Sequence, residues 1–547
     1  MNHLTTILVF VILAAGLSAQ NKKSGNWPSP NTFESMQKMI DSGFWTGAVI
    51  AWQEGKKSEV RAYGTLANGA KEAVDARSQF EIGSISKVFT TLILCDAVEK
   101  KELALSDPVA VLLGDAHKVS RTVGAITLEE LATHTSGLPR MPFNFKPEHN
   151  ENPYADYGRK ELFACLKNYS VDDKRRGKYA YSNLGMGLLG TVLEVVLKKS
   201  WGTLVSERIT TPLGMIATGP TAIGKNVATG HSGRLPTPAW DFQSLAAAGD
   251  LVSNAADMMK FACMCLGQTD SKLKPLVDLA ARKRADVAPG TTVGLAWLAL
   301  DNGKRRIVWH NGGTGGFLSF FGFEPARNRA VFMVVNCNGP AVTNLGLNAF
   351  DASVPTGLDH LPVVRKLKDK ELLSCVGRYE MTGGLIFDVK KVRDFLTVTI
   401  PGQSSYTLYA SALNEFFLTV APARCHFVPD KNGRIESLIW SQVGVDQRAR
   451  RIKDSQETVK VSAEELARFA GNYELEEGQV LTITTKDTVI EAQLTGQPAL
   501  PIYPVSSNKF VYRVVNASLT FKVGDDEKIV SVTLHQDGKD IIAPRVK

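Results

Sequence analysis

The sequence predicts an α+β domain, in which helices cover one antiparallel sheet, followed by two small antiparallel β-barrels. Three observations support this prediction: a hairpin pattern near the N-terminus, a second group of strand patterns near residue 320, and a repeat in the last third of the chain. The 547 residues are 44% apolar and 22% charged, which is typical of globular proteins and excludes a disordered or collagen-like chain. Several domains are expected, because single cores rarely exceed about 300 residues.

Upstream of residue 362, strand patterns lie at both ends and helical patterns lie between them. Residues 47–53 and 58–64, separated by the turn EGKK, are typical of an antiparallel hairpin, and the second group covers 305–310, 316–323 and 329–336. The helical patterns are 86–101, 128–134, 183–199 and 255–266. Strands from both ends of a region with helices between them indicate one antiparallel sheet, so residues 20–361 are predicted to be a single α+β domain.

The last third of the chain repeats itself at a spacing of 94 residues, so that Tyr379 recurs as Tyr473. Each copy begins with a short helical pattern and continues as alternating strand patterns separated by Gly, Asp and Asn. Several short strands in under about 100 residues favour a small antiparallel barrel. We therefore expect two related barrels, at residues 362–455 and 456–547.

An apolar run at residues 4–19 predicts export. The run is shorter than the roughly 20 residues that span a bilayer, and it ends in the small residues Ser18 and Ala19. Residues 1–19 are therefore predicted to be a signal peptide, which leaves a periplasmic or secreted protein without a stable membrane anchor. An uncleaved anchor is the alternative, because the run lacks the usual Lys or Arg before it.

Charge and motif content exclude several classes of function. The formal net charge is +8, but Lys and Arg are spread along the chain, so no nucleic-acid partner is expected. The nine histidines and seven cysteines show no HExxH, CxxC or clustered ligand spacing, so neither a metal nor a cofactor is predicted. The cysteines are interpreted as buried free thiols. Neither a G-x-S-x-G elbow nor a G-x-x-x-x-G-K phosphate loop occurs.

One candidate catalytic pair stands where a loop enters the helical pattern 86–101. Ser84 and Lys87, in the string FEIGSISK, are three residues apart, so their side chains can meet on one face of a helix. A neutral lysine amine can take the proton of a serine hydroxyl, but the reference pKa of lysine is about 10.4. Burial or neighbouring cations must therefore lower that pKa by roughly three units. Three other S-x-x-K matches occur, so this spacing alone is weak evidence for a catalytic pair. Two further sequence elements support the assignment of Ser84 and Lys87.

The two further elements follow in a fixed order along the chain. Tyr181 and Asn183 form a Y-x-N pattern at a predicted helix start. His310, Gly312 and Gly313 lie at the end of a predicted strand, where glycine lets the backbone approach a ligand closely. An incidental set of surface and cap residues is the alternative to a catalytic site.

With these residues the sequence resembles the serine β-lactamase and penicillin-binding protein superfamily, and its class C branch in particular. The class C signature matches FEIGSISK at every position, and the similarity covers about residues 33–340, including the stretch LATHTSGLP at 131–139. The resemblance implies the β-lactamase/DD-peptidase-like fold and a serine hydrolase that forms an acyl-enzyme. In that scheme Ser84 would be the nucleophile, Lys87 its base partner, and Tyr181 the general base or proton shuttle.

The resemblance also implies a substrate-binding group. Asn183 would bind the substrate amide, and His310 would take the place of the Lys in the family's K-T-G motif. Gly312 and Gly313 complete that motif, and the backbone N–H groups of Ser84 and Gly313 would form the oxyanion hole. His310 is a departure, because imidazole is mostly neutral at pH 7 and anchors a substrate carboxylate less strongly than lysine.

The departure leaves several activities open. An H-x-G third motif is similar to that of soluble DD-peptidases, D-aminopeptidases and esterases of the superfamily, and D-aminopeptidases also resemble this chain in having two barrels after the hydrolase domain. The predicted function is β-lactamase-type amide hydrolysis through a Ser84 acyl-enzyme. The alternatives are D-aminopeptidase, DD-peptidase or carboxylesterase action, or a penicillin-binding sensor without turnover. The expected partner is a small molecule or peptide with an amide or ester bond.

Overall fold

In the computed structural model the chain forms two compact units, with the boundary between Leu361 and Pro362. The predicted signal peptide, 1–19, lies outside the described residues. The described residues are 27–115, 117–303, 305–358, 361–382, 385–400, 405–452, 459, 461–476, 478–486, 489–497, 499–512, 515, 517–525, 527–536 and 538–546.

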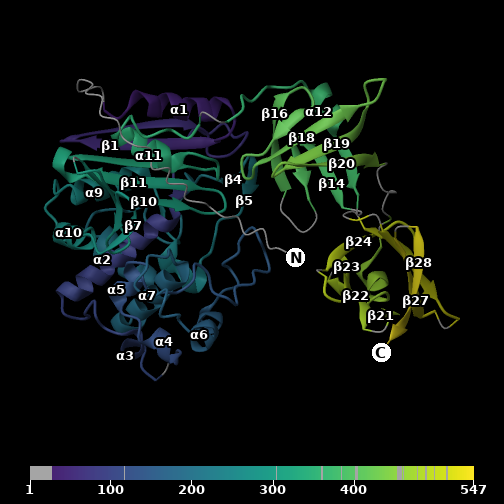
Figure 1. The fold of residues 1–547 in the computed structure, drawn as a ribbon, viewed down its shortest axis with the longest axis horizontal. Coiled ribbons are helices and arrows are strands. Elements are labelled where there is room, and N and C mark those ends of the chain that lie inside the picture. The colour runs from purple at the N-terminus through teal and green to yellow at the C-terminus, as the bar shows by residue number, and fades with distance from the viewer. Residues whose placement is uncertain are drawn as a thin grey trace. The chain divides into compact units, whose positions relative to one another are not determined.

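An eight-stranded sheet in the order β2-β1-β12-β11-β10-β9-β8-β7 forms the centre of the first unit, and its neighbouring strands are antiparallel (Figure 1). The N-terminal hairpin pairs with the last strand, with Ala48 opposite Val335, so the two ends of the region meet as predicted. The strands are β1 (Gly47–Glu54), β2 (Lys57–Gly64), β7 (Ala285–Ala288), β8 (Thr291–Val293), β9 (Leu298–Asp301), β10 (Arg306–Gly313), β11 (Leu318–Glu324) and β12 (Arg329–Val335).

Helices cover both faces of this sheet. Adjacent residues of a strand point to opposite faces, so Phe320 and Phe321 of β11 mark the two sides. Phe320 packs against Gly346 of α11 (Val342–Phe350), whereas the ring of Phe321 lies 5.3 Å from that of Phe261 in α9 (Ala255–Cys265). Burial on both faces explains why β1 and β12 read as continuous apolar runs rather than alternating ones.

The four predicted helices are present, and each ends one or two residues before its predicted end. They are α2 (Ser86–Glu99), α5 (Leu128–Ala132), α7 (Asn183–Leu197) and α9. A residue with positive φ follows closely on each of them: Lys101, His134, Lys198 and Gly267. Residues in this left-handed conformation commonly end helices, and glycine is the usual one. Three of these four residues are not glycine, so the sequence did not show where the helices end. The spacing of Thr127 and Glu130 in the sequence predicts a capping box at the start of α5, and the structure confirms it.

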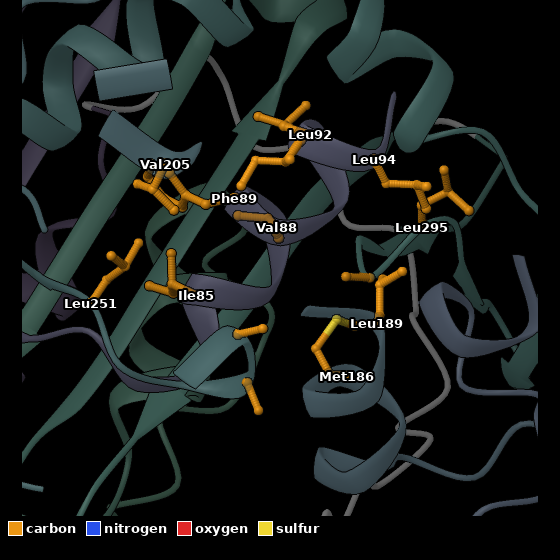
Figure 2. Packing of buried hydrophobic residues seen from close by; sticks show 14 of the residues in the cluster. Ile85, Val88, Phe89, Leu92, Leu94, Met186, Leu189, Val205, Leu251 and Leu295 are labelled. Atoms are coloured by element: carbon orange, nitrogen blue, oxygen red, sulfur yellow. The ribbon is translucent and has the colours of Figure 1, made fainter. Parts of the chain in front are cut away.

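Helix α2 forms the buried centre of the first unit. Ten consecutive residues, from Ser86 to Cys95, are buried, because neighbouring elements enclose the helix on all sides. Figure 2 shows apolar side chains meeting it from several directions, among them Leu189 of α7 and Val205 of α8 (Trp201–Val205). Lys87 therefore lies in an apolar interior.

A close helix crossing brings polar acceptors to this helix. At Gly190 of α7, a Cβ would lie 2.2 Å from the Cβ of Ala247 in η3 (Gln243–Ala248), so only glycine allows this approach. The crossing positions two backbone carbonyls against α2. Thr90 Oγ1 donates to the Ala247 carbonyl at 2.8 Å, and Lys87 Nζ donates to the Ala248 carbonyl at 2.5 Å.

The remaining elements of the first unit are short apart from α1, which packs with α11. The helices are α1 (Pro30–Asp41), η1 (Gly83–Ile85), α3 (Val109–Leu113), α4 (Arg121–Gly124), α6 (Arg159–Asn168), η2 (Ser206–Thr210), α10 (Lys274–Ala280) and η4 (Pro325–Arg327). The strands are β3 (Phe80–Glu81), β4 (Gly230–Ser232), β5 (Leu235–Thr237) and β6 (Val252–Ser253). The seven cysteines are unpaired as predicted, and six are buried, but Cys263 is partly exposed.

The second unit contains two closed eight-stranded antiparallel barrels, as predicted. The first follows α12 (Asp369–Cys375) and comprises β13 (Gly377–Met381), β14 (Ile386–Val392), β15 (Phe395–Thr399), β16 (Ser405–Ala412), β17 (Glu415–Phe417), β18 (Ala423–Pro429), β19 (Ile435–Gln442) and β20 (Val445–Ile452). The other follows α13 (Ala463–Ala467) and comprises β21 (Gly471–Glu476), β22 (Gln479–Lys486), β23 (Val489–Leu494), β24 (Leu500–Pro504), β25 (Lys509–Tyr512), β26 (Ala517–Val523), β27 (Ile529–Gln536) and β28 (Lys539–Val546).

Both barrels carry the same contacts at positions 94 residues apart. The hydroxyls of Tyr379 and Tyr473 each donate, at 2.8 Å, to the backbone carbonyl four residues earlier. The guanidinium carbons of Arg451 and Arg545 each lie 5.9 Å from the centroid of the corresponding tyrosine ring. No helix among the described residues is long and apolar enough to cross a membrane.

The crossing of α7 and η3 gives a stability prediction. We expect Gly190→Ala to lower the unfolding free energy of the first unit by about 1–3 kcal/mol, because the new methyl overpacks against Ala247. Urea denaturation followed by tryptophan fluorescence measures this change. Gly219→Ala is the control, since a Cβ there meets nothing within 4 Å and its φ is not positive. A Gly190→Ala protein as stable as the wild type would contradict the packing described.

Candidate active site

Ser84 and Lys87 are in direct contact. Ser84 lies in the single turn η1 before α2, and Lys87 Nζ is 2.9 Å from Ser84 Oγ. The Lys87 side chain is fully buried, and its other polar partner is the Ala248 carbonyl. The structure therefore shows the predicted contact between the side chains of Ser84 and Lys87.

The surroundings of Lys87 favour its uncharged form. Burial lowers the pKa of Lys87 well below its usual value, and the positive charge of Arg140 lowers it further. Among the described residues, no carboxylate forms an ion pair with Lys87 that would stabilise an ammonium. A neutral amine can donate to the Ala248 carbonyl while its lone pair accepts the Ser84 hydroxyl proton.

Glycines bring the end of β10 against the turn that carries Ser84. A Cβ at Gly312 would lie 1.9 Å from the Ile82 carbonyl oxygen, and a Cβ at Gly83 would lie 2.6 Å from the Gly313 nitrogen. Gly83 also has φ +51°, a conformation that side chains disfavour. The neighbouring strand β9 pairs with β10 only as far as Trp309, so the glycine end of β10 extends beyond it beside Ser84.

The ring of Tyr181 lies at the centre of the site. Lys87 Nζ is 4.8 Å from its centroid, and the rings of His134 and His310 are centred 4.5 and 6.2 Å away. Burial raises the pKa of Tyr181 strongly, and an interaction with Ser84 opposes part of that rise. A phenol that holds its proton is a poor general base. Of the two roles that the resemblance implies for Tyr181, general base and proton shuttle, this environment favours the proton shuttle.

Asn183 and His310 each have a buried polar atom that forms no hydrogen bond with any described residue. Asn183 Nδ2 donates to the Tyr154 hydroxyl at 3.2 Å, which leaves its buried Oδ1 unpaired. His310 Nδ1 is 2.6 Å from the Asn311 carbonyl oxygen, so Nδ1 carries the hydrogen and the unpaired Nε2 is an acceptor. Burial, together with the nearby Lys87, lowers the pKa of His310 to about 3, so His310 supplies no positive charge at neutral pH.

Two residues around Tyr181 were not singled out from the sequence. His134 Nδ1 accepts the backbone N–H of Ser182 at 3.2 Å, and its burial lowers the pKa of its imidazole well below the usual value. Arg140 has its guanidinium carbon 5.2 Å from the centroid of the Tyr181 ring. His134 falls within the stretch LATHTSGLP that carries the family resemblance, so this motif could have indicated His134 as a residue of the site. Arg140 lies one residue beyond it, so no motif indicated it.

The comparisons with known proteins identify the family. The model of the Beta-lactamase family matches residues 36–355, which is more than half of the chain, so the chain belongs to this family. A second model, a domain of unknown function (DUF3471), matches residues 455–543, which cover most of the last barrel. The predicted superfamily and fold are thereby confirmed.

Individual relatives are distant. Unguisins hydrolase ungD' of Aspergillus campestris is 26% identical over 342 residues, which cover 58% of this chain and 63% of that protein. The D-alanyl-D-alanine-carboxypeptidase/endopeptidase AmpH of Escherichia coli is 26% identical over 315 residues, covering 53% and 79%. Among solved structures, a class C β-lactamase of Rhodobacter sphaeroides has a TM-score of 0.52 at 23% identity, covering 59% of this chain and 99% of that one.

The contact between β10 and η1 predicts unequal effects for two neighbouring glycines. Gly312→Ala places a methyl against the Ile82 carbonyl, so β10 must move away from Ser84, and we expect kcat/KM to fall about 100-fold or more, the scale of losing an oxyanion-hole donor. Gly313→Ala is the matched control, because its Cβ meets, among the described residues, only a terminal methyl of Leu318 at 3.1 Å and a backbone oxygen at 3.8 Å. Equal rates for the two variants would contradict the geometry.

Proposed function

We propose that the protein is an exported serine hydrolase that cleaves amides through an acyl-enzyme on Ser84, most closely of the β-lactamase type. The observation that carries this proposal is the 2.9 Å contact between Ser84 Oγ and the amine of a fully buried Lys87 with a lowered pKa. Export rests on the apolar run at residues 4–19.

In the acylation step, Lys87 takes the hydroxyl proton of Ser84 as the oxygen attacks the substrate carbonyl carbon. The backbone N–H groups of Ser84 and Gly313 donate to the oxygen that becomes negative, and fixed donors of this kind are worth about 2.7–4 kcal/mol each. The amide C–N bond then breaks, and the leaving nitrogen needs a proton. Tyr181 gives its hydroxyl proton to that nitrogen and receives the proton held by Lys87, so the two side chains end as they began.

In the deacylation step, a water molecule attacks the ester carbonyl of the acyl-enzyme. Tyr181 and Lys87 relay the water's proton to Ser84 Oγ as the ester bond breaks, which releases a carboxylic acid and restores the enzyme. The same two donors hold the oxyanion. A site that acylates but lacks access for this water would act as a penicillin-binding sensor.

Peptidase action on D-amino-acid substrates is the second candidate. It is favoured by His310, which is uncharged where the K-T-G lysine of the β-lactamases provides a fixed cation. AmpH, a relative whose name describes a D-alanyl-D-alanine carboxypeptidase and endopeptidase, supports the same candidate. Both candidates use the same acyl-enzyme and differ in the amide that they cleave.

Replacement of the nucleophile tests the acyl-enzyme. The wild type should take up a fluorescent penicillin covalently and should hydrolyse at least one of a chromogenic cephalosporin, a D-alanyl peptide and a short-chain aryl ester. Ser84→Ala should lose all of these activities and the label, because it removes the hydroxyl that contacts Lys87 Nζ at 2.9 Å and is the proposed nucleophile. Stable labelling of the wild type without turnover would indicate the sensor. Labelling retained by Ser84→Ala would contradict the proposal.

The lowered pKa of Lys87 predicts an acid limb in the pH–rate profile. Below that pKa the amine is protonated and cannot accept the Ser84 proton, so kcat/KM should fall as the pH falls through it. Glu81 is a competing source of such a limb, because burial raises its pKa to about 7. The limb should persist in Glu81→Gln, and its loss in that variant would assign it to Glu81 and contradict the role of Lys87.

A further inference from the structure

We propose that Arg140 is a specificity-determining residue that binds a carboxylate of the substrate, so that the preferred substrates are amides carrying a carboxylate near the scissile bond. This inference rests on the proposed Ser84 acyl-enzyme and names the substrate class for it.

Arg140 belongs to the site by its contacts. Its guanidinium carbon is 5.2 Å from the centroid of the Tyr181 ring, and the same ring lies 4.8 Å from Lys87 Nζ. The Arg140 carbonyl accepts the backbone N–H groups of Asn183 at 2.9 Å and Leu184 at 3.3 Å, which fixes its backbone to the start of α7. The side chain itself is exposed, so a substrate can reach the guanidinium from solvent.

The guanidinium of Arg140 forms no ion pair with any carboxylate of the described residues. Three other arginines of this unit, in contrast, are paired: Arg176 with Glu130 at 2.6 Å, Arg208 with Asp96 at 2.7 Å, and Arg305 with Glu324 at 2.9 Å. Arg140 is therefore an arginine at the candidate site whose charge is not neutralised by any carboxylate of the described residues. Its planar fork of donors matches a carboxylate in two parallel hydrogen bonds.

The rest of the site gives a substrate carboxylate little positive charge to bind. Burial lowers the pKa values of Lys87, His134 and His310, which favours the uncharged form of each. Guanidinium stays protonated at all working pH values, and the charge of Arg140 acts on both Lys87 and Tyr181. The cation that the K-T-G lysine supplies in the β-lactamases is thus replaced by one from a different segment of the chain.

Arg140 has a second effect that the experiment must separate. Its positive charge lowers the pKa of Lys87, so removing it should raise that pKa and move the acid limb to higher pH for every substrate. Carboxylate binding, in contrast, affects only substrates that carry a carboxylate. A pair of substrates that differ only in this group distinguishes the two effects, provided that rates are taken on the pH plateau of each variant.

The experiment compares a chromogenic cephalosporin with its methyl ester, and a short-chain aryl ester reports the nucleophile alone. The second-order rate constant of acylation is measured for the wild type, Arg140→Gln, Arg140→Lys and Arg121→Gln. Arg121 is an exposed arginine of α4, so its replacement removes the same charge elsewhere. Arg140→Gln should slow acylation by the cephalosporin about tenfold or more and change the methyl ester less than about twofold.

The controls and the added salt complete the test. Arg140→Lys should keep most of the preference for the carboxylate, and Arg121→Gln should keep all of it. Salt should slow the carboxylate substrate in the wild type and have little effect in Arg140→Gln. An equal loss for both cephalosporins, or no loss, would overturn the role of Arg140 while leaving the acyl-enzyme intact. A wild type that is acylated by none of the three reagents would instead overturn the proposed function, and this inference with it.

Discussion

The site depends on one constraint: Lys87 is buried and has no carboxylate partner in the part of the chain that the structure describes. A charged ammonium in an apolar interior costs several kcal/mol, so the low-energy state of this lysine is the neutral amine. The Ala248 carbonyl satisfies one of its N–H groups, and Ser84 Oγ lies at its other polar contact. The apolar packing of α2 thus has a chemical consequence: it keeps a lysine available as a base.

Much of the surrounding fold holds this arrangement in place. Gly190 lets η3 approach α7, and this approach places the Ala248 carbonyl where it accepts a hydrogen bond from Lys87 Nζ. Gly312 lets β10 approach the turn of Ser84 from the other side. The interior is poor in charge, whereas the exposed Arg140 lies beside Tyr181. The buried base, Lys87, and the solvent-accessible cation, Arg140, suit a substrate whose scissile amide enters the site while its carboxylate stays near the surface.

The sequence was informative wherever a local pattern determines structure. The hairpin at 47–64, the capping box at Thr127 and the barrels followed from periodicity, capping chemistry and the 94-residue repeat. That Ser84 and Lys87 can meet followed from helical spacing, whereas their roles as nucleophile and base partner followed from the family resemblance. Arg140 did not, because its contact with Tyr181 joins segments about 40 residues apart that carry no shared pattern. An uncharged His310 was expected from the ordinary pKa of imidazole, but the lowering of that pKa to about 3 depends on burial that only the folded chain provides.

Direct titration of Lys87 tests the central claim most closely. In protein labelled with 13C at the lysine ε-carbons, NMR follows each amine as a function of pH, and Lys87→Gln identifies the resonance of interest. One resonance should titrate well below the usual value of about 10.4 and should be missing from the Lys87→Gln spectrum. If every lysine titrates near 10.4, Lys87 is an ordinary ammonium at neutral pH, and the account of Ser84 activation is wrong.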